Sequence, residues 1–460
     1  MNLLDTIAAV STPYGKGGIA VIRISGKDAL VIAERVFSPA NGKKLSEVQK
    51  NLTVYGRIYS QDGEQIDDGM GVCFYGPNSF TGEDTVEISC HGGILITQQV
   101  LLSVLGAGAR AAGAGEFTRR AFVNGKMKLT SAEALGNLLE ASTGEQIKVA
   151  RSGMRGSLSK KTDVIYDSLG NILASVFAHI DYPDEDLADM SKEDMLLAIR
   201  ENIRELGALC DTYKTGRAVV EGIPTAIAGR PNAGKSSLYN KILGREAAIV
   251  TDIEGTTRDV LTETTLLGRV LLRLSDTAGI RSTGDVVEKI GVERAMRQIE
   301  DAELVLAIFD GSTPPTAEDE ELKSLLCNKG CVSICLLNKS DKGICPEAER
   351  FSKEFEYSIG ISAQSGAGMT ELASLVESIY IDKSLDIGAD AIISNARQHS
   401  AAARALESLN LACSYIQSDL PLEVCCAELE AGMSALGELD GRTVSEDIVS
   451  KIFANFCVGK

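Results

Sequence analysis

The stretch Ile227–Ser237, IAGRPNAGKSS, decides the fold of the central part of this chain. It leads from a short apolar run into a segment with the spacing G-x-x-x-x-G-K-[ST], between an expected strand and an expected helix. In such a loop Gly229 and Gly234 let backbone N–H groups close on a phosphate, and Lys235 reaches the β- and γ-phosphate oxygens. The Ser236 hydroxyl can bind Mg²⁺. The stretch therefore predicts a phosphate loop.

The sequence around this loop predicts several domains. Strand-like and helix-like runs alternate from about residue 217 to residue 382, which is the order of a doubly wound parallel sheet. Residues 1–124 mix strands with a few helices, as in an α+β domain, whereas residues 125–216 and 383–460 have helical apolar spacing. We therefore expect a multidomain α/β chain in which a Ras-like doubly wound phosphate-loop domain (217–382) is inserted into one helical domain (125–216 and 383–460), after an N-terminal α+β domain (1–124).

The composition of the chain argues against several classes of partner and cellular location. The net charge of −18 argues against a chain that coats nucleic acid non-specifically, since such binding depends on Lys and Arg. The 11 cysteines of a 460-residue chain make no disulfide framework, and no apolar run reaches the roughly 20 residues of a membrane span. We expect a cytoplasmic protein without membrane contact. Its cysteines Cys327, Cys331, Cys335, Cys425 and Cys426 are expected to be small core residues rather than cluster ligands.

Three further stretches predict that the nucleotide is GTP. DTAG (Asp276–Gly279) ends a strand, so its aspartate can hold Mg²⁺ through water and its glycine N–H can meet the γ-phosphate. NKSD (Asn338–Asp341) also ends a strand, and its last carboxylate can accept the N1–H and the exocyclic amine of guanine, a donor pair that adenine lacks. SAQSG (Ser362–Gly366) can offer backbone N–H groups to the guanine O6. Four such stretches in this order make a chance match negligible.

The segment between the phosphate loop and DTAG predicts a switch loop. GTTRD (Gly255–Asp259) can supply Thr257 to Mg²⁺, and switch loops order around the γ-phosphate. Ile280 stands directly after DTAG, where Ras-like enzymes place a water-orienting glutamine. Hydrolysis therefore needs another acid–base group and another source of positive charge.

Long stretches from end to end resemble the MnmE (TrmE) family of tRNA-modification GTPases. They include TPYGKGGIAVIRISG, GPNSFTGEDTVEISCHGG, GEFTRRAFVNGKMKLTSAEA, DTAGIRSTGDVVEKIGVERA and the terminal FCVGK. The resemblance implies that the protein is a GTPase activated by K⁺ and that it forms a homodimer through its N-terminal domains. It also implies an FAD-containing partner, MnmG, in a heterotetramer or larger complex that adds an aminomethyl or carboxymethylaminomethyl group to C5 of wobble uridine in certain tRNAs.

The resemblance also assigns residues to the site. It implies that K⁺ is bound by Asn232, Thr251, Ile253 and Thr256, that Glu288 positions the attacking water beside Lys235, and that Mg²⁺ is bound by Ser236 and Thr257. It implies a folate-binding-like N-terminal domain in which Arg23, Glu87, Lys126 and Lys460 bind a one-carbon tetrahydrofolate, with Cys457 nearby or buried as a structural cysteine. Together with the motifs, it gives as GTP-binding residues Asn232, Ala233, Gly234, Lys235, Ser236, Ser237, Thr251, Asp252, Ile253, Glu254, Gly255, Thr256, Thr257, Asp276, Thr277, Ala278, Gly279, Asn338, Lys339, Asp341, Ser362 and Ala363.

Two alternatives remain open from the sequence. A GTPase that serves ribosome assembly would share GRPNAGKS and NKSD, but it usually adds a second GTPase domain or an RNA-binding module, and neither is visible. A scaffold that uses GTP only for structure would be favoured by lost catalytic groups, but here all of them are present. The basic stretch RSGMRGSLSKK (151–161) is a candidate tRNA contact through Arg151, Arg155, Lys160 and Lys161, or else a solvated helix face.

Overall fold

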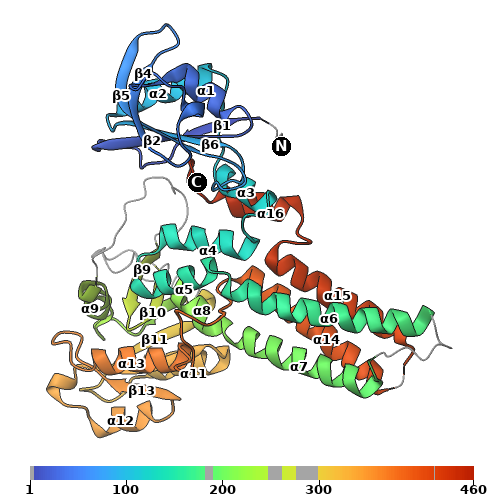
Figure 1. The fold of residues 1–460 in the computed structure, drawn as a ribbon. Coiled ribbons are helices and arrows are strands. Elements are labelled where there is room, and N and C mark those ends of the chain that lie inside the picture. The colour runs from blue at the N-terminus through green and yellow to red at the C-terminus, as the bar shows by residue number, and fades with distance from the viewer. Residues whose placement is uncertain (1–4, 182–189, 247–261, 276–298, 419) are drawn as a thin grey trace. The chain divides into compact units, whose positions relative to one another are not determined.

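The computed structural model of this chain describes residues 5–181, 190–246, 262–275, 299–418 and 420–460 (Figure 1). The chain divides into two compact units, and each consists of separate segments of sequence. The first unit comprises Met1–Glu140, Gly153–Ile199 and Glu407–Lys460, and the second comprises Ala141–Ser152 and Arg200–Leu406. The domain boundaries expected at 124, 216 and 382 differ from the borders of these units and stay a prediction.

The first unit contains a seven-stranded sheet with the order β3-β4-β5-β6-β2-β1-β7. Its neighbouring strands are antiparallel except for β1 and β7, which are parallel. The strands are β1 (Ile7–Val10), β2 (Ile19–Ser25), β3 (Phe37–Pro39), β4 (Val54–Tyr59), β5 (Gln65–Phe74), β6 (Thr85–His91) and β7 (Arg110–Ala111). The connecting helical segments are α1 (Ala29–Val36), η1 (Leu45–Glu47) and α2 (Ile94–Gly106).

The two faces of this sheet differ because side chains alternate along each strand. Ile22, Ile24 and Ile88 are buried in one core cluster with residues of α1 and α2. Arg23 and Glu87 come from the alternate positions of β2 and β6, are only partly buried, and are opposite each other in the strand register. The sheet therefore places two predicted ligand-binding residues side by side on the face away from this core.

Helices complete the first unit and carry the C-terminal segment to the sheet. Val449 and Phe453 pack against Leu129 in one apolar cluster, and the last residues then reach the end of β1. There Ser11 Oγ donates to Gly459 O over 3.1 Å, and a Cβ on Gly459 would lie 2.2 Å from Val10 O. These helices are α3 (Glu116–Val123), α4 (Leu129–Glu140), α6 (Ser157–Asp181), α15 (Leu422–Asp440) and α16 (Glu446–Ala454).

The second unit is built on a six-stranded sheet with the order β13-β12-β11-β8-β10-β9. All neighbouring strands are parallel except β9 and β10. After the central β8 the chain continues first on one side of it and later on the other, so the strand order reverses at β8. The strands are β8 (Ile223–Ala228), β9 (Thr262–Leu267), β10 (Val270–Ser275), β11 (Leu304–Asp310), β12 (Val332–Asn338) and β13 (Tyr357–Gly360).

The helices of this unit follow the strands in the expected alternation. They are α8 (Tyr213–Val220), α9 (Lys235–Glu246), α11 (Ala317–Lys329), η2 (Ser340–Lys342), α12 (Pro346–Ser352) and α13 (Met369–Tyr380). Three helices run across the borders between the segments of the two units: α5 (Gly144–Met154), α7 (Lys192–Asp211) and α14 (Ala396–Gln417). Within the described ranges no helix combines the length and the apolar composition that a membrane span requires.

The cysteine predictions are largely confirmed. Cys335 is buried in β12, and Cys425 and Cys426 are buried in α15. Cys331, just before β12, is only partly buried, and Cys327 is exposed on α11, so the expectation of a core residue is wrong for Cys327. Cys457 is exposed, so the alternative that it is a buried structural cysteine is wrong.

Candidate functional site

The phosphate loop follows β8, at the point where the strand order of the sheet reverses. Open α/β sheets bind ligands at this point, outside the carboxyl ends of the strands. Gly229 and Gly234 have φ angles of +153° and +111°. A Cβ on Gly229 would lie 2.3 Å from Ile308 O, and one on Gly234 would lie 2.1 Å from Asn338 Nδ2. Both glycines of the motif are therefore required by the packing of the loop as well as by its backbone conformation.

The Lys235 side chain is hydrogen-bonded to backbone carbonyl groups of its own loop. Its Nζ donates to Gly229 O over 2.7 Å and to Arg230 O over 3.0 Å. Burial lowers the pKa of this ammonium group, because the charged form loses hydration. A phosphate group would supply the negative charge that the two carbonyl oxygens only partly replace. Asn232, Ser236 and Ser237 are exposed beside it, as expected of groups that meet a ligand.

Asn338 links the phosphate loop to the loop after β13. Its Nδ2 donates to Ala233 O over 2.7 Å, and its Oδ1 accepts from Ala363 N over 2.9 Å. The side chain is buried, so both amide groups take part in a buried bridge. Asn338 was predicted to bind GTP, and the sequence did not indicate this bridge. In the structure it joins two loops that carry predicted nucleotide contacts.

The rest of the NKSD loop is arranged around this bridge. Lys339 has a φ of +63°, and its Nζ contacts Asp310 Oδ2 at 2.6 Å. Burial would raise the pKa of Asp310, but hydrogen bonds from Lys339 and Ser312 outweigh it and hold the pKa below its usual value. The Asp341 side chain is exposed in η2. An exposed carboxylate next to a fixed loop is suited to accept the paired donors of a base.

The SAQSG loop forms a closed turn, in which Ser362 N donates to Ala367 O over 3.0 Å. Ser362 Oγ accepts from Ser365 N over 3.2 Å, and the carbonyl oxygen of Ser362 accepts from Gly366 N over 2.7 Å. Ile361 O accepts from Ser340 N over 3.0 Å, so this turn is also tied to the NKSD loop. Ser362 and Ala363 are thus brought next to Asn338, as the sequence predicted for one nucleotide site.

The remaining predicted residues of the nucleotide site lie outside the described residues. These are Thr251, Asp252, Ile253, Glu254, Gly255, Thr256, Thr257, Asp276, Thr277, Ala278, Gly279 and Glu288. Their assignments to GTP, Mg²⁺, K⁺ and the attacking water stay predictions.

A second group of predicted residues meets in the first unit. Arg23 donates from Nε to Glu87 Oε1 over 2.8 Å, and its Nη2 lies 2.8 Å from the same oxygen. The guanidinium carbon lies 5.5 Å from the ring centre of Phe80 and 5.6 Å from that of Phe117. Arg23 is therefore held by one carboxylate and two aromatic rings. The sequence had assigned Arg23 and Glu87 separately to a ligand, and the structure also pairs them with each other.

Lys126 and the C-terminal residues approach the same part of the unit. Lys126 Nζ donates to Pro77 O over 2.7 Å, in the loop that also carries Phe80. Lys460 follows Gly459, which packs on the end of β1 as described above. In the pairing of β1 with β2, Arg23 lies opposite Ala9, which is next to Val10. The four residues predicted for the folate thus lie on elements that contact one another within this unit.

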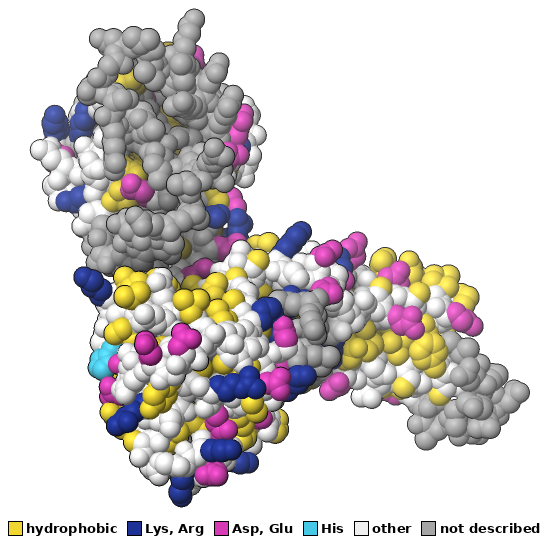
Figure 2. Space-filling model, turned by 90° about the horizontal axis from the view of Figure 1, so that it is seen from above, with side chains coloured by type: hydrophobic (Ala, Val, Ile, Leu, Met, Phe, Trp, Pro, Cys, Tyr) yellow, Lys and Arg dark blue, Asp and Glu magenta, His cyan; other side chains and the backbone are white. Residues whose placement is uncertain are grey.

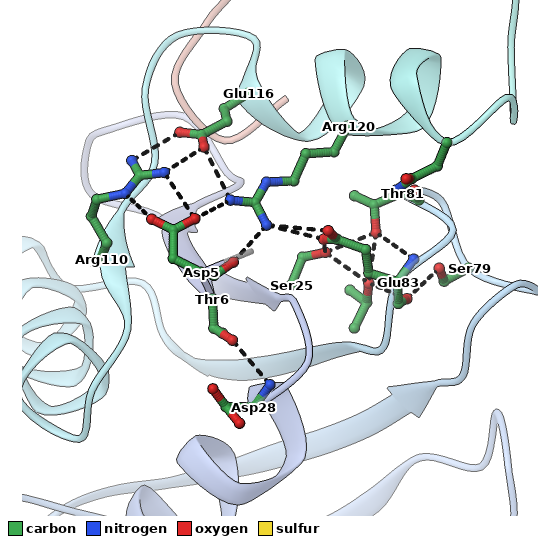
Figure 3. A network of polar contacts seen from close by, with 12 residues as sticks. Asp5, Thr6, Ser25, Asp28, Ser79, Thr81, Glu83, Arg110, Glu116 and Arg120 are labelled. Carbon is green, nitrogen blue, oxygen red and sulfur yellow. Dashed lines mark hydrogen bonds and ion pairs between the residues drawn. The ribbon is translucent and has the colours of Figure 1, made fainter. Parts of the chain in front are cut away.

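A partly buried ionic network around Arg120 lies in the same unit (Figure 3). Arg120 is buried and contacts three carboxylates: Nη2 to Asp5 Oδ1 at 2.7 Å, Nη1 to Glu83 Oε2 at 3.2 Å and Nη2 to Glu116 Oε1 at 3.2 Å. Arg110 contacts Asp5 and Glu116, each at 2.6 Å. This network was not predicted from the sequence. Its only local signal is the pair Glu116 and Arg120, four residues apart on a helix that also contains buried Phe117.

The pKa values of two carboxyl groups reflect this network. The hydrogen bond from Arg110 lowers the pKa of Asp5 below its usual value, and Arg120 adds to this effect. For Glu116, burial would raise the pKa, but Arg110, the Gly113 N–H and Arg120 together outweigh it and lower the pKa. In both groups the surroundings therefore favour the ionised carboxylate over the protonated acid.

The strand order, the phosphate loop at the reversal point and the bridged NKSD loop together define a Ras-like phosphate-loop GTP-binding protein. Comparison with known protein families identifies the family to which the chain belongs. Residues 6–126 match the family described as "GTP-binding protein TrmE N-terminus", and residues 129–457 match "MnmE helical domain". The chain therefore belongs to the MnmE (TrmE) family.

Curated relatives agree with this assignment. The chain is 40% identical to the tRNA modification GTPase MnmE of Clostridioides difficile over 463 residues, with 100% of both chains covered. It is 40% identical to the MnmE of Heliobacterium modesticaldum over 465 residues, with 99% of both covered. Among solved structures, Era of Aquifex aeolicus bound to GDP and AlF4⁻ is 26% identical, covers 41% of this chain and 66% of its own, and has a TM-score of 0.26. The predicted fold class and the prediction of a GTPase of this family are confirmed by the family matches and the sheet order.

Proposed function

We propose that this protein is a K⁺-activated GTPase that acts in the modification of wobble uridine in tRNA. The observation that carries the GTPase part is the Asn338 bridge between the phosphate loop and the SAQSG loop, beside the exposed Asp341. A fixed spacing between these loops suits a ligand with phosphates at one end and guanine at the other. The full-length relatives at 40% identity, named tRNA modification GTPases, support the tRNA part.

The chemistry of the donor groups fits the two proposed cations. Ser236 offers an exposed hydroxyl at the first turn of α9, which suits Mg²⁺, a hard cation with oxygen ligands. Asn232 offers an exposed amide oxygen in the phosphate loop, which suits K⁺. When bound, the two cations would stabilise negative charge that develops on the phosphates. Lys235 binds and orients the β- and γ-phosphates, and Glu288 orients the attacking water, in the place of the glutamine that Ile280 replaces.

The second polar group fits a tetrahydrofolate derivative. Both contacts of Arg23 use Oε1 of Glu87, so the carboxylate can present Oε2 to the donor edge of a pterin. Phe80 is partly exposed above Arg23 and offers a ring face for stacking. Lys126 and Lys460 supply positive charge for the carboxylates of the folate tail. The bound folate would supply the one-carbon unit, while the residues of the chain bind and orient it.

The proposed partners are a second copy of the chain, the FAD-containing protein MnmG and tRNA, in the cytoplasm. Arg151, Arg155 and Lys160 are exposed, which is compatible both with a tRNA contact and with a solvated helix face. On the coloured part of the face in Figure 2, dark blue basic and magenta acidic side chains are interspersed. Because the net charge of the chain is −18, we propose a local tRNA contact rather than a broad basic surface.

Reconstitution tests the proposed function. The purified chain is combined with MnmG, substrate tRNA, GTP, Mg²⁺, K⁺ and a one-carbon tetrahydrofolate, and each component is then omitted in turn. We expect modified wobble uridine only when GTP and the folate are both present. Modification that persists without GTP would contradict the coupling, and modification that persists without folate would contradict the assignment of the second site.

A further inference from the structure

We infer that Arg120 is a positioning residue for the second site, because it fixes the loop Tyr75–Asp84 from its buried side. The inference rests on the proposed function, since it concerns the folate site proposed above. Arg120 lies on α3 with its guanidinium buried, and it contacts the loop through both oxygens of Glu83 at 3.2 Å. It is anchored on its other side by Asp5, through the carboxylate and the backbone carbonyl, each at 2.7 Å.

Glu83 is one of the points at which this loop is attached to the rest of the unit. Its Oε2 accepts from Ser25 Oγ over 2.8 Å, and its carbonyl oxygen accepts from Ser79 Oγ over 2.5 Å. Thr81 Oγ1 accepts from the Glu83 N–H over 3.2 Å and lies 2.8 Å from Ser25 Oγ. In Figure 3 the Glu83 carboxylate points toward Arg120 and Ser25, and Ser79 lies on the other side of Glu83. The Glu83 carboxylate thus links the loop to Ser25 of β2 and to Arg120 of α3.

The same loop supplies groups of the second site. Phe80 stacks on Arg23, and Pro77 O accepts from Lys126. Asn124, just after α3, donates to Thr81 O over 2.8 Å. A shift of the loop would therefore move the ring above Arg23 and the carbonyl that orients Lys126. Arg120 is hydrogen-bonded to this loop through Glu83, so we expect its effect on a ligand to pass through Glu83.

Two residues of α3, three positions apart, help to fix the surroundings of the Arg23 side chain. Phe117 packs directly against the Arg23 guanidinium, and Arg120 holds the loop that carries Phe80. Residues three apart on a helix lie on one face, so a single rigid element sets both walls around Arg23. Glu87 then receives Arg23 in a fixed orientation, which leaves less conformational entropy to be lost when a ligand binds.

Arg120 and Arg110 differ in one respect that makes a matched control possible. Both contact Asp5 and Glu116, but Arg110 reaches Ala111 O as its further acceptor, whereas Arg120 reaches Glu83 in the loop. Lys at either position keeps the charge but replaces a planar fork with one ammonium group, which cannot bridge two acceptors in the same way. Arg110→Lys therefore weakens the network without removing the link to the loop.

The test uses full-length protein and 5-formyltetrahydrofolate, a one-carbon folate that is stable in air, with affinity measured by calorimetry. We expect Arg120→Lys to weaken folate binding about 10- to 100-fold, by analogy with the loss found when hydrogen-bond partners of metal ligands are removed. Arg110→Lys should bind within about twofold of the wild type, and all variants should hydrolyse GTP normally. Glu83→Gln tests the same link if Arg120→Lys folds poorly. The variant that combines Arg120→Lys and Glu83→Gln should bind folate no more weakly than the weaker-binding of the two single variants, because both changes break the same link.

Hydrogen exchange of the folate-free protein gives a second readout. Amides of residues 75–84 should exchange faster in Arg120→Lys and in Glu83→Gln than in Arg110→Lys. Equal folate affinity and equal exchange in the Arg120→Lys and Arg110→Lys proteins would overturn the inference. If the wild type binds no folate, the folate part of the proposed function fails. The exchange measurement then decides by itself whether Arg120 holds the loop.

Discussion

Replacement of Asn338 by alanine should weaken nucleotide binding and destabilise the second unit. The change removes the donor to Ala233 O and the acceptor from Ala363 N, at 2.7 and 2.9 Å. A buried polar group that loses its partner costs about 1–3 kcal/mol. Because both loops carry predicted nucleotide contacts, we expect part of this cost to fall on binding. Since 1.4 kcal/mol is about tenfold, GDP affinity should fall roughly tenfold or more.

Fluorescent GDP titration and thermal unfolding measure the two effects of this change. A loss of 1 kcal/mol lowers the melting temperature of a unit of this size by roughly 2–4 °C. Asn338→Asp keeps the acceptor for Ala363 N but loses the donor, so it tests the Ala233 half of the bridge. Asn328→Ala, on the exposed side of α11, is the control and should change neither quantity. A normal GDP affinity together with a normal melting temperature in Asn338→Ala would refute the bridge.

Three other changes follow from the same structure. Asp341→Asn should shift the preference from guanine toward xanthine, because an amide can donate to the 2-oxo group of xanthine; competition between GDP and XDP measures this, and an unchanged preference contradicts it. GTP turnover should be faster in K⁺ than in matched Na⁺ buffer, and Asn232→Ala should remove the difference; equal rates in the wild type would exclude K⁺ activation. Asp5 and Glu116 have lowered pKa values in the folded chain, so their contribution to folding is present well above the ordinary values of 3.8 and 4.5 and is lost as the pH falls through the lowered values. Acid unfolding of Asp5→Asn should therefore depend less steeply on pH than that of the wild type, and identical slopes would contradict this sign.

The sequence predicted the parts of the nucleotide site that depend on local order. A glycine-rich loop between a strand and a helix has one main use, so Gly229, Gly234 and Lys235 could be assigned from spacing alone. The NKSD and SAQSG loops follow strands of a parallel sheet, and such strand ends meet at one edge. Strand order alone is therefore enough to predict that Asp341 and Ser362 belong to one site.

Contacts between distant residues could not be predicted in the same way. Arg120 and Glu83 are 37 residues apart, Arg120 and Asp5 are 115 apart, and Ser11 and Gly459 are 448 apart. No periodicity joins such positions, because each contact depends on how several elements pack. The Arg23–Glu87 pair depends on the register of two strands that are separated by three others in the chain. Its residues were found by resemblance to the family, but their pairing was not.

The central claim is that GTP hydrolysis by this chain is required for modification of wobble uridine, and Glu288→Ala tests it most directly. Removing a water-orienting acid should lower kcat on the order of 10²-fold with little change in GTP affinity, because the group acts mainly in the transition state. Mass spectrometry of tRNA from a deletion strain complemented with the wild type, Glu288→Ala or the exposed control Glu300→Ala gives the answer. The account predicts modified wobble uridine with the wild type and Glu300→Ala and none with Glu288→Ala. Normal modification by a Glu288→Ala protein that binds GTP but does not hydrolyse it would contradict the claim.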